Sequence, residues 1–227
     1  MARNEEILVT GANGFVGSHL VEALLGAGYR VRGMVRRSSD LRFLRGLPVE
    51  LVYGDVRDGE GLEAACDGVS AVCHCAALTR APDRATFYEV NTGGAEALAR
   101  ASLAANPTLS RFLFVSSQTA AGPSREAGDF VDETRPPQPV TWYGESKEAA
   151  EQALAALARE RGLPLTIVRP SAVLGPRDKD FFEEFRLIQR GLDLQIGRGG
   201  GRRISLIYVR DLVALLVRAL EAPAAVG

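Results

Sequence analysis

Short apolar runs alternate along the chain with longer stretches in which apolar residues recur at helical spacing. The short runs predict strands over residues 5–9, 29–35, 49–53, 71–75, 111–115, 165–168 and 204–209. The helical spacing predicts helices over residues 18–28, 39–46, 58–66, 84–105, 142–161, 181–190 and 210–220. Strands and helices that alternate in this way are typical of a parallel sheet with helices on both faces. We therefore predict an α/β fold with a doubly wound parallel sheet.

Composition and charge exclude several classes of protein. The 227 residues are 46% hydrophobic, enough for a large core, and the formal net charge of −1 favours neither nucleic acid nor an anionic membrane surface. The chain has no run of about 18 apolar residues and no recognisable signal peptide. Its three cysteines, Cys66, Cys73 and Cys75, fit a reducing compartment. We therefore expect a cytoplasmic protein.

The sequence Cys73-His74-Cys75 raises the question of a metal site. The surrounding residues 71–77 read as a buried strand, in which the two cysteines share one face as small hydrophobic residues. The chain has only one other cysteine and one other histidine, too few for a zinc ligand set. We therefore expect no metal ion.

A glycine turn follows the first predicted strand, with the sequence TGANGFVG at residues 10–17. Gly11 permits the tight turn, Gly14 lets the backbone approach a phosphate, and Gly17 lets the helix pack against the strand. The N–H groups of the following helix then point at a diphosphate. No Gly-Lys-Ser/Thr follows, so the turn is not a P-loop. Purely structural glycines are the alternative interpretation, but the strand–turn–helix context favours dinucleotide binding.

Three further residues carry candidate chemistry. Tyr143 and Lys147 are four residues apart on a predicted helix and share a face, where a cation would lower the phenol pKa from about 10. Such a phenol can transfer a proton near pH 7. Ser117 ends a predicted strand where ligands bind in parallel sheets. The predicted loop over residues 118–140 is long enough to serve a site. A surface Tyr–Lys pair and an ordinary strand-end turn are the alternatives, but the order of the three features favours catalysis.

Together, the glycine turn, the strand-end serine and Tyr-x-x-x-Lys resemble the short-chain dehydrogenase/reductase superfamily. More narrowly, they resemble its extended branch, the NAD-dependent epimerase/dehydratase family, as far as Tyr208-Val209-Arg210-Asp211. The resemblance implies a Rossmann-type dinucleotide-binding domain over residues 1–170 and a small partial substrate lobe over residues 171–227. The family usually continues well beyond this point, so we expect either a natural short form or a truncation, with an incomplete lobe.

The resemblance also implies roles for single residues. Tyr143 would be the acid/base, and Lys147 would hold the nicotinamide ribose and tune Tyr143. Ser117 would polarise the substrate carbonyl with Thr119 as a helper, and Arg203 would contact substrate. Asn91 matches a family asparagine near the site, although it also reads as a polar residue on a helix surface. The expected cofactor-binding residues are Gly11, Asn13, Gly14, Phe15, Val16, Gly17, Arg36, Asp55, Val56, Ala76, Ala77, Asn91, Lys147, Pro170 and Ser171.

Three departures from the family pattern carry information. Family members that use NAD often place an acid after the second strand, whereas this chain has Arg36-Arg37-Ser38, which suits the 2′-phosphate of NADP. Gln118 stands where sugar dehydratases carry an Asp-Glu pair, which disfavours dehydration. Arg203 lies one place further from Val209 than in nucleotide-sugar epimerases, a spacing closer to reductases and hydroxysteroid dehydrogenases. The alternative is that these arginines are merely solvated and that the cofactor is NAD.

We predict an oxidoreductase that transfers hydride between NADP(H) and a secondary alcohol or carbonyl compound. A nucleotide-sugar epimerase with tightly bound NAD is the first alternative, and a non-catalytic dinucleotide sensor is the second. The sensor is disfavoured because it has no need of Ser117, Tyr143 and Lys147. We expect a small-molecule substrate, no nucleic-acid or membrane partner, and a homodimer as the assembly to test.

Overall fold

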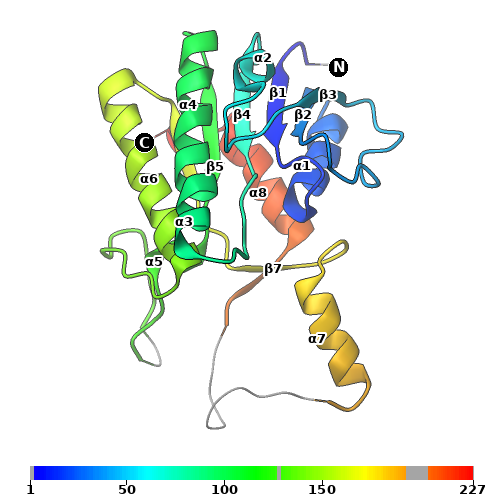
Figure 1. Cartoon of the computed structure of the whole chain (residues 1–227), viewed down its shortest axis with the longest axis vertical. Coiled ribbons are helices and arrows are strands. Elements are labelled where there is room, and N and C mark those ends of the chain that lie inside the picture. Colours follow the sequence, from blue (N-terminus) through cyan, green and yellow to red (C-terminus); the bar gives the residue numbers. More distant parts are fainter. Residues whose placement is uncertain (1–2, 127–128, 193–203, 227) are drawn as a thin grey trace.

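The computed structural model describes residues 3–126, 129–192 and 204–226, and its centre is a six-stranded parallel sheet (Figure 1). The strand order is β3-β2-β1-β4-β5-β6, the doubly wound arrangement with a switch between β1 and β4. The strands are β1 (Glu6–Thr10), β2 (Arg30–Val35), β3 (Glu50–Tyr53), β4 (Ala71–His74), β5 (Arg111–Val115) and β6 (Leu165–Val168). The predicted fold class is confirmed, and each of these strands lies within two residues of its expected bounds.

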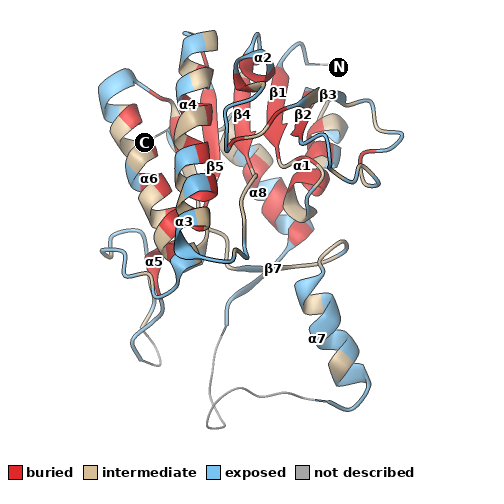
Figure 2. Cartoon of the chain, in the orientation of Figure 1, coloured by how far each residue is buried: buried red, intermediate tan, exposed pale blue. Residues whose placement is uncertain are grey.

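Helices cover both faces of the sheet and bury two separate apolar cores (Figure 2). One face carries α1 (Phe15–Gly26) and α8 (Val209–Glu221), and the other carries α2 (Leu62–Cys66), α4 (Gly94–Ala105) and α6 (Trp142–Arg161). Side chains alternate along β5, so that Leu113 faces the first core while Phe112 and Phe114 face the second. A strand covered on both faces is apolar throughout, as the short runs of the sequence indicated.

Two predicted helices differ in the structure. The helix expected over residues 39–46 is wrong: this segment forms hydrogen-bonded turns, because the Asp40 carboxylate accepts the Arg42 N–H and Gly46 has a φ of 81°. The helix expected over residues 58–66 is reduced to α2, because Gly59 and Gly61 both have positive φ.

The helix predicted over residues 84–105 is continuous but not uniform. It consists of α3 (Arg84–Phe87), a π-helical turn η1 (Tyr88–Gly93) and α4. Such turns are frequent at functional sites, and this one carries Asn91, whose side chain contacts the loop after β4.

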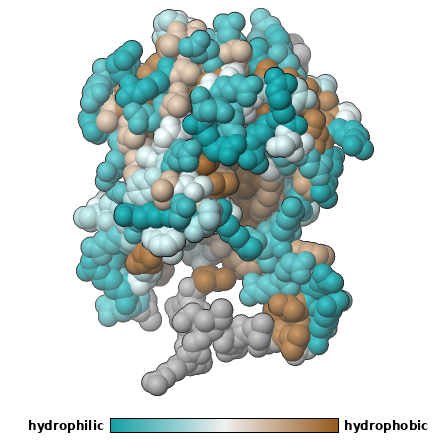
Figure 3. All heavy atoms as spheres, in the orientation of Figure 1, coloured by the Kyte–Doolittle hydropathy of each residue, from teal (hydrophilic) through white to brown (hydrophobic). Residues whose placement is uncertain are grey.

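The chain after β6 is arranged more loosely. The strand β7 (Ala172–Leu174), which the sequence did not predict, pairs in parallel with β8 (Leu206–Tyr208). Between them α7 (Asp180–Gln189) has no buried residue and stands away from the sheet (Figure 1). Its exposed apolar residues are Phe182, Phe185 and Ile188, and the space-filling view shows a brown area on this part of the surface (Figure 3).

The remaining short helices are α5 (Gln118–Ala121), which lies in the segment expected to be a loop, and the 3₁₀ turn η2 (Pro223–Ala225). In the part of the chain that the structure describes, no helix combines the length and apolar character that a bilayer crossing requires. The predicted division at residue 170 stays a prediction. Within the predicted lobe, however, α8 packs on α1 through Leu212 and Leu216 as part of the sheet's helical layer.

Candidate active site

A cavity of about 780 Å³ opens at the carboxyl ends of the strands, where ligands bind in this type of sheet. The glycine turn forms one wall, and all of its residues expected to bind cofactor line the cavity: Gly11, Asn13, Gly14, Phe15, Val16 and Gly17. The other expected residues that line it are Ala77, Ser117, Tyr143, Lys147, Pro170 and Ser171. The fold therefore brings the glycine turn and the three candidate catalytic residues to one cavity.

The glycine turn is shaped by close backbone contacts. Gly11 has a φ of 63°, and a Cβ there would lie 2.9 Å from the backbone of Ala76. A Cβ on Gly17 would lie 2.1 Å from the Gly11 carbonyl oxygen, so α1 could not approach β1 with any other residue. Gly14 is the N-cap of α1 and supplies no capping side chain. The first N–H groups of α1 are therefore left for a ligand.

Ser117 and Thr119 form a small hydrogen-bonded unit at the end of β5. Ser117 is the N-cap of α5, and its Oγ accepts hydrogen bonds from the Thr119 N–H at 3.2 Å and the Thr119 hydroxyl at 2.9 Å. These bonds use Ser117 Oγ only as an acceptor, and its own hydroxyl proton can be donated to Tyr143 or to a ligand. Thr119 itself does not line the cavity, and its contact with the site is through these two bonds to Ser117.

Tyr143 reaches the cavity because α6 begins close to α5. The Thr141 hydroxyl caps α6 by accepting the Gly144 N–H at 3.1 Å, and a Cβ on Gly144 would lie 2.5 Å from the Thr119 carbonyl oxygen. Burial raises the pKa of Tyr143, while a hydrogen bond to Ser117 lowers it by a smaller amount. The expected lowering of this pKa by Lys147 is not found. The Nζ of Lys147 is bonded to the Val115 carbonyl oxygen, and burial decides the direction of the Tyr143 pKa shift.

Lys147 is buried, with 1% of its surface exposed. Its Nζ donates a hydrogen bond to the Val115 carbonyl oxygen at 2.7 Å and lies 4.1 Å from the centroid of the Phe114 ring. Burial lowers the pKa of Lys147 to about 7, against the opposing effects of Cys75 and Glu151. Lys147 is thus a lysine that can lose its proton near neutral pH.

A buried ion pair behind these residues was not found from the sequence. Glu151 lies one helical turn beyond Lys147 on α6 and accepts a 2.5 Å hydrogen bond from the Ser116 hydroxyl. Arg169, at the end of β6, donates to both carboxylate oxygens of Glu151, at 2.9 and 3.1 Å from its Nε. The pair joins β5, α6 and β6 directly beneath the cavity. The spacing of Glu151 from Lys147 was the one available sequence signal.

Several expected cofactor residues lie outside the cavity wall. The Asn91 side chain is buried and bonds within the protein, accepting from the Leu78 N–H at 2.8 Å and donating to the Leu78 carbonyl and Ser146 hydroxyl oxygens. It therefore positions the loop after β4 rather than presenting a free polar group. Ala76 donates its N–H to the Thr10 hydroxyl at 3.3 Å.

Beyond the carboxyl end of β3, Asp55 forms an ion pair with Arg57 at 2.6 Å, which lowers the pKa of Asp55, and Val56 is buried against α4. Arg36 is exposed beside this end of the sheet, where its charge further lowers the Asp55 pKa. Arg37 instead lies over the Tyr53 ring. The expected substrate residue Arg203 lies outside the described residues.

Cys73 and His74 are buried in β4, as the strand prediction implied. The His74 Nδ1 is 2.7 Å from the Thr10 hydroxyl, and burial lowers the His74 pKa to about 3. Among the described residues, no group of three or more His, Cys, Asp and Glu side chains is arranged to hold a metal ion.

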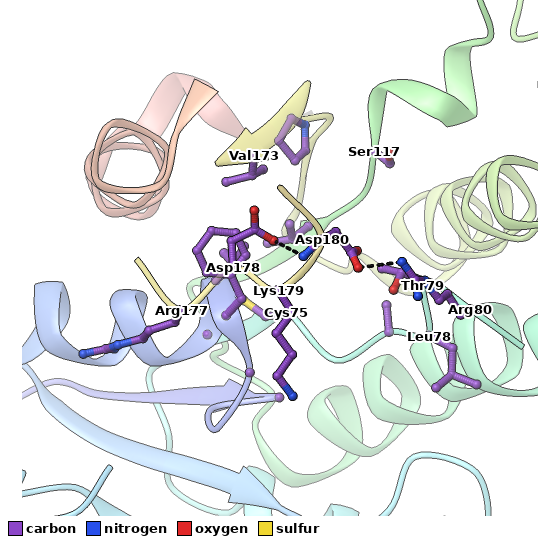
Figure 4. A pocket seen from close by; sticks show the side chains of 18 of the residues that line it. Cys75, Leu78, Thr79, Arg80, Ser117, Val173, Arg177, Asp178, Lys179 and Asp180 are labelled. Carbon is purple, nitrogen blue, oxygen red and sulfur yellow. Dashed lines mark hydrogen bonds and ion pairs between the residues drawn. The ribbon is translucent and has the colours of Figure 1, made fainter. Parts of the chain in front are cut away.

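A segment that we call the strap, residues 175–181, runs from the end of β7 into the first two residues of α7 and lines the cavity (Figure 4). On one side Arg177 forms an ion pair with Glu22 of α1 at 2.5 Å and donates to the Ser18 hydroxyl at 3.0 Å. On the other side Asp180 forms an ion pair with Arg80 at 2.6 Å. The strap therefore forms one ion pair with the sheet domain on each side of the cavity.

The geometry agrees with comparisons to known proteins. The model of the NAD dependent epimerase/dehydratase family matches residues 7–227. The chain belongs to this family. Within the epimerase/dehydratase family, the chain is 35% identical over 220 residues to sterol demethylase protein B of Methylococcus capsulatus, covering 94% of this chain and 65% of that protein.

Two further family comparisons cover most of the chain. It is 36% identical over 217 residues to ceramide reductase of Caulobacter vibrioides, covering 96% of this chain and 61% of that protein. The solved structure of Thermus thermophilus UDP-glucose 4-epimerase in complex with NAD superposes with a TM-score of 0.83 at 28% identity, covering 96% of this chain and 75% of that one. The chain therefore spans 61–65% of the length of the two curated relatives named here.

Proposed function

We propose that this chain is the dinucleotide-binding and catalytic part of an NAD(P)-dependent oxidoreductase that interconverts a secondary alcohol and a carbonyl compound. The observation that carries the proposal is the single cavity lined by the glycine turn together with Ser117, Tyr143 and Lys147. A dinucleotide-binding turn alone would serve a sensor, but a sensor needs no proton donor beside it. The predicted substrate lobe, residues 171–227, and a homodimeric assembly belong to the same proposal.

The bound nicotinamide would supply or accept the hydride, and the protein's own residues would manage the proton. Ser117 would donate a hydrogen bond to the substrate carbonyl oxygen, and Tyr143 would transfer its single hydroxyl proton to that oxygen. The raised pKa of Tyr143 keeps it in the acid form, which the reductive direction requires. Lys147 lies on the same helix face and binds the ribose next to the reacting ring.

We further propose that NADP(H) binds more tightly than NAD(H). No acidic residue follows β2 until Asp40, and the Asp40 carboxylate is engaged by Arg42 at 2.5 Å. Arg36 stands at the end of β2, and among the described residues no ion pair of its side chain is seen. A guanidinium in that place can form charge-assisted hydrogen bonds to a 2′-phosphate.

Turnover measurements test the oxidoreductase. The protein should oxidise added NADPH in the presence of one or more members of a panel of aldehydes and ketones. Tyr143→Phe should keep the cofactor dissociation constant and lose turnover by about 10²–10⁴-fold, because the ring stays and the proton is removed. A Tyr143→Phe rate within a few-fold of the parent would show that Tyr143 is not the acid/base.

An epimerase is the second candidate, because an NAD-bound UDP-glucose 4-epimerase is among the similar structures. An epimerase would purify with its dinucleotide and convert nucleotide sugars without added cofactor. That result, together with no net NADPH oxidation on the carbonyl panel, would replace the oxidoreductase proposal with the epimerase. Binding of dinucleotide without turnover of either substrate class would indicate a sensor.

A further inference from the structure

Lysine is nearly absent from this chain. Of the 27 lysine and arginine residues, only Lys147 and Lys179 are lysines, and both line the cavity. Lys147 already has a place in the proposed catalytic group. Lys179 does not, because it lies on the strap on the opposite side of the cavity from the sheet.

Lys179 lies between two ion pairs of the strap, a partly buried one at Arg177 and an exposed one at Asp180. Arg177 is fixed by Glu22 and Ser18 and also lies 4.9 Å from the centroid of the Phe43 ring. Asp180, the residue after Lys179, is fixed by Arg80. Figure 4 shows the Lys179 side chain extending from the strap toward the blue ribbon of the first strand and turn. A cation presented from an already ordered segment loses little backbone entropy when it meets a ligand.

The charges on the cavity wall distinguish Lys179 from its neighbours. Each arginine that lines the cavity is in an ion pair: Arg42 with Asp40, Arg80 with Asp180 and Arg177 with Glu22. In residues 3–126, 129–192 and 204–226, Lys179 forms no ion pair and its ammonium no hydrogen bond. The glycine turn, residues 10–17, contributes no charged side chain. The turn therefore offers backbone dipoles, and the strap offers the ammonium of Lys179 beside the Asp178 carboxylate, which accepts the N–H groups of Asp180 and Phe181.

We propose that Lys179 binds the diphosphate of the dinucleotide from the strap side, opposite the N–H groups of α1. This inference rests on the proposed dinucleotide-binding function. A diphosphate carries two negative charges, and an ammonium is a compact charge that can approach either phosphate as three donors. The 2′-phosphate of NADP lies at the other end of the cofactor, and Arg36 would bind it.

Calorimetry with three ligands tests the assignment, since ADP-ribose, NAD⁺ and NADP⁺ all carry the diphosphate and only NADP⁺ carries a 2′-phosphate. Lys179→Gln should weaken the binding of all three by about tenfold, the value of one partly exposed charge-assisted contact. Lys179→Arg should recover most of the affinity. Arg159→Gln, which removes an exposed cation at the far end of α6, should leave all three dissociation constants unchanged.

The other outcomes overturn the assignment in separable ways. A loss confined to NADP⁺ would show that Lys179 contacts the 2′-phosphate instead. Unchanged affinity for all three, with a raised KM for the carbonyl substrate, would show that it contacts substrate. If Gly14→Val abolishes binding while Lys179→Gln does not weaken it, the dinucleotide site is supported and the proposed role of Lys179 is wrong. If the parent binds none of the three, the proposed function itself fails.

Discussion

At the scale of single residues, the same residue type behaves differently according to what surrounds it. Arg36 and Arg37 are adjacent in sequence, yet Arg37 lies over Tyr53 and within 3.8 Å of Glu60, whereas neither contact is made by Arg36. The sequence predicted that Arg36 binds the 2′-phosphate, with Arg37 and Ser38 as support. The structure separates the two arginines into an engaged one and an available one.

Arg36→Ala should therefore change cofactor choice, and Arg37→Ala should not. Loss of one charge-assisted contact to the 2′-phosphate should raise the dissociation constant for NADP(H) by about tenfold. This factor is at the low end of the range for such contacts, because solvent screens the exposed site. The constant for NAD(H) should stay the same. Titrating parent, Arg36→Ala and Arg37→Ala with both cofactors measures this. A parent that prefers NAD(H), or an unmoved ratio in Arg36→Ala, would contradict the predicted phosphate contact.

At the scale of elements, the candidate catalytic residues come from different segments whose relative positions must be fixed. Ser117 follows β5, while Tyr143 and Lys147 lie on α6. The buried Glu151 carboxylate joins α6 to β5 through Ser116 and to β6 through Arg169. Removing one partner of such a pair leaves a buried charge without compensation.

Glu151→Gln should lower kcat by roughly 10–100-fold with cofactor affinity nearly unchanged, because small misplacements of reacting groups are costly. The matched control is Glu6→Gln, which breaks a similarly buried pair with Arg32 at 2.9 Å, at the opposite end of the sheet. Both variants should lose thermal stability, but only Glu151→Gln should lose kcat. Equal kcat losses in the two variants would reduce Glu151 to a structural role.

At the scale of the whole molecule, burial of ionisable groups links folding to pH. Lys147 has an ordinary pKa of 10.5 when unfolded and a pKa of about 7 when folded. Above pH 7 the unfolded state therefore binds more protons than the folded state, so stability must rise with pH. Cys75 changes stability with pH in the opposite direction, because burial raises its pKa to about 12. Its unfolded thiol loses a proton above about pH 8.5, and the two effects then oppose each other.

Between about pH 7 and pH 8.5 the parent should gain stability relative to Lys147→Met, with a slope difference of up to about 1.4 kcal/mol per pH unit. Denaturant unfolding at several pH values in this window measures it. Lys179→Met is the control, because Lys179 is exposed and should leave the slope of the parent in place. Parallel curves for the parent and Lys147→Met would mean that Lys147 stays protonated in the folded protein.

The sequence by itself determined the features that depend on a few neighbouring residues. Apolar runs identified all six strands of the main sheet, and the helix predicted over residues 142–161 is α6 with the same bounds. The glycine spacing and the four-residue separation of Tyr143 and Lys147 identified two parts of the cavity wall, the glycine turn and the face of α6. These signals are local because backbone conformation and helix faces repeat over short distances.

Only the tertiary structure decided what depends on residues far apart in the chain. Arg177 meets Glu22 across 155 positions, and Arg80 meets Asp180 across 100, so no local pattern predicts the strap over the cavity. The raised pKa of Tyr143 and the lowered pKa of Lys147 arise from desolvation, which depends on every element packed around them. The spacing of residues in the sequence predicts that Tyr143 and Lys147 share a helix face. Their burial in the folded protein decides which protonation state each side chain has there.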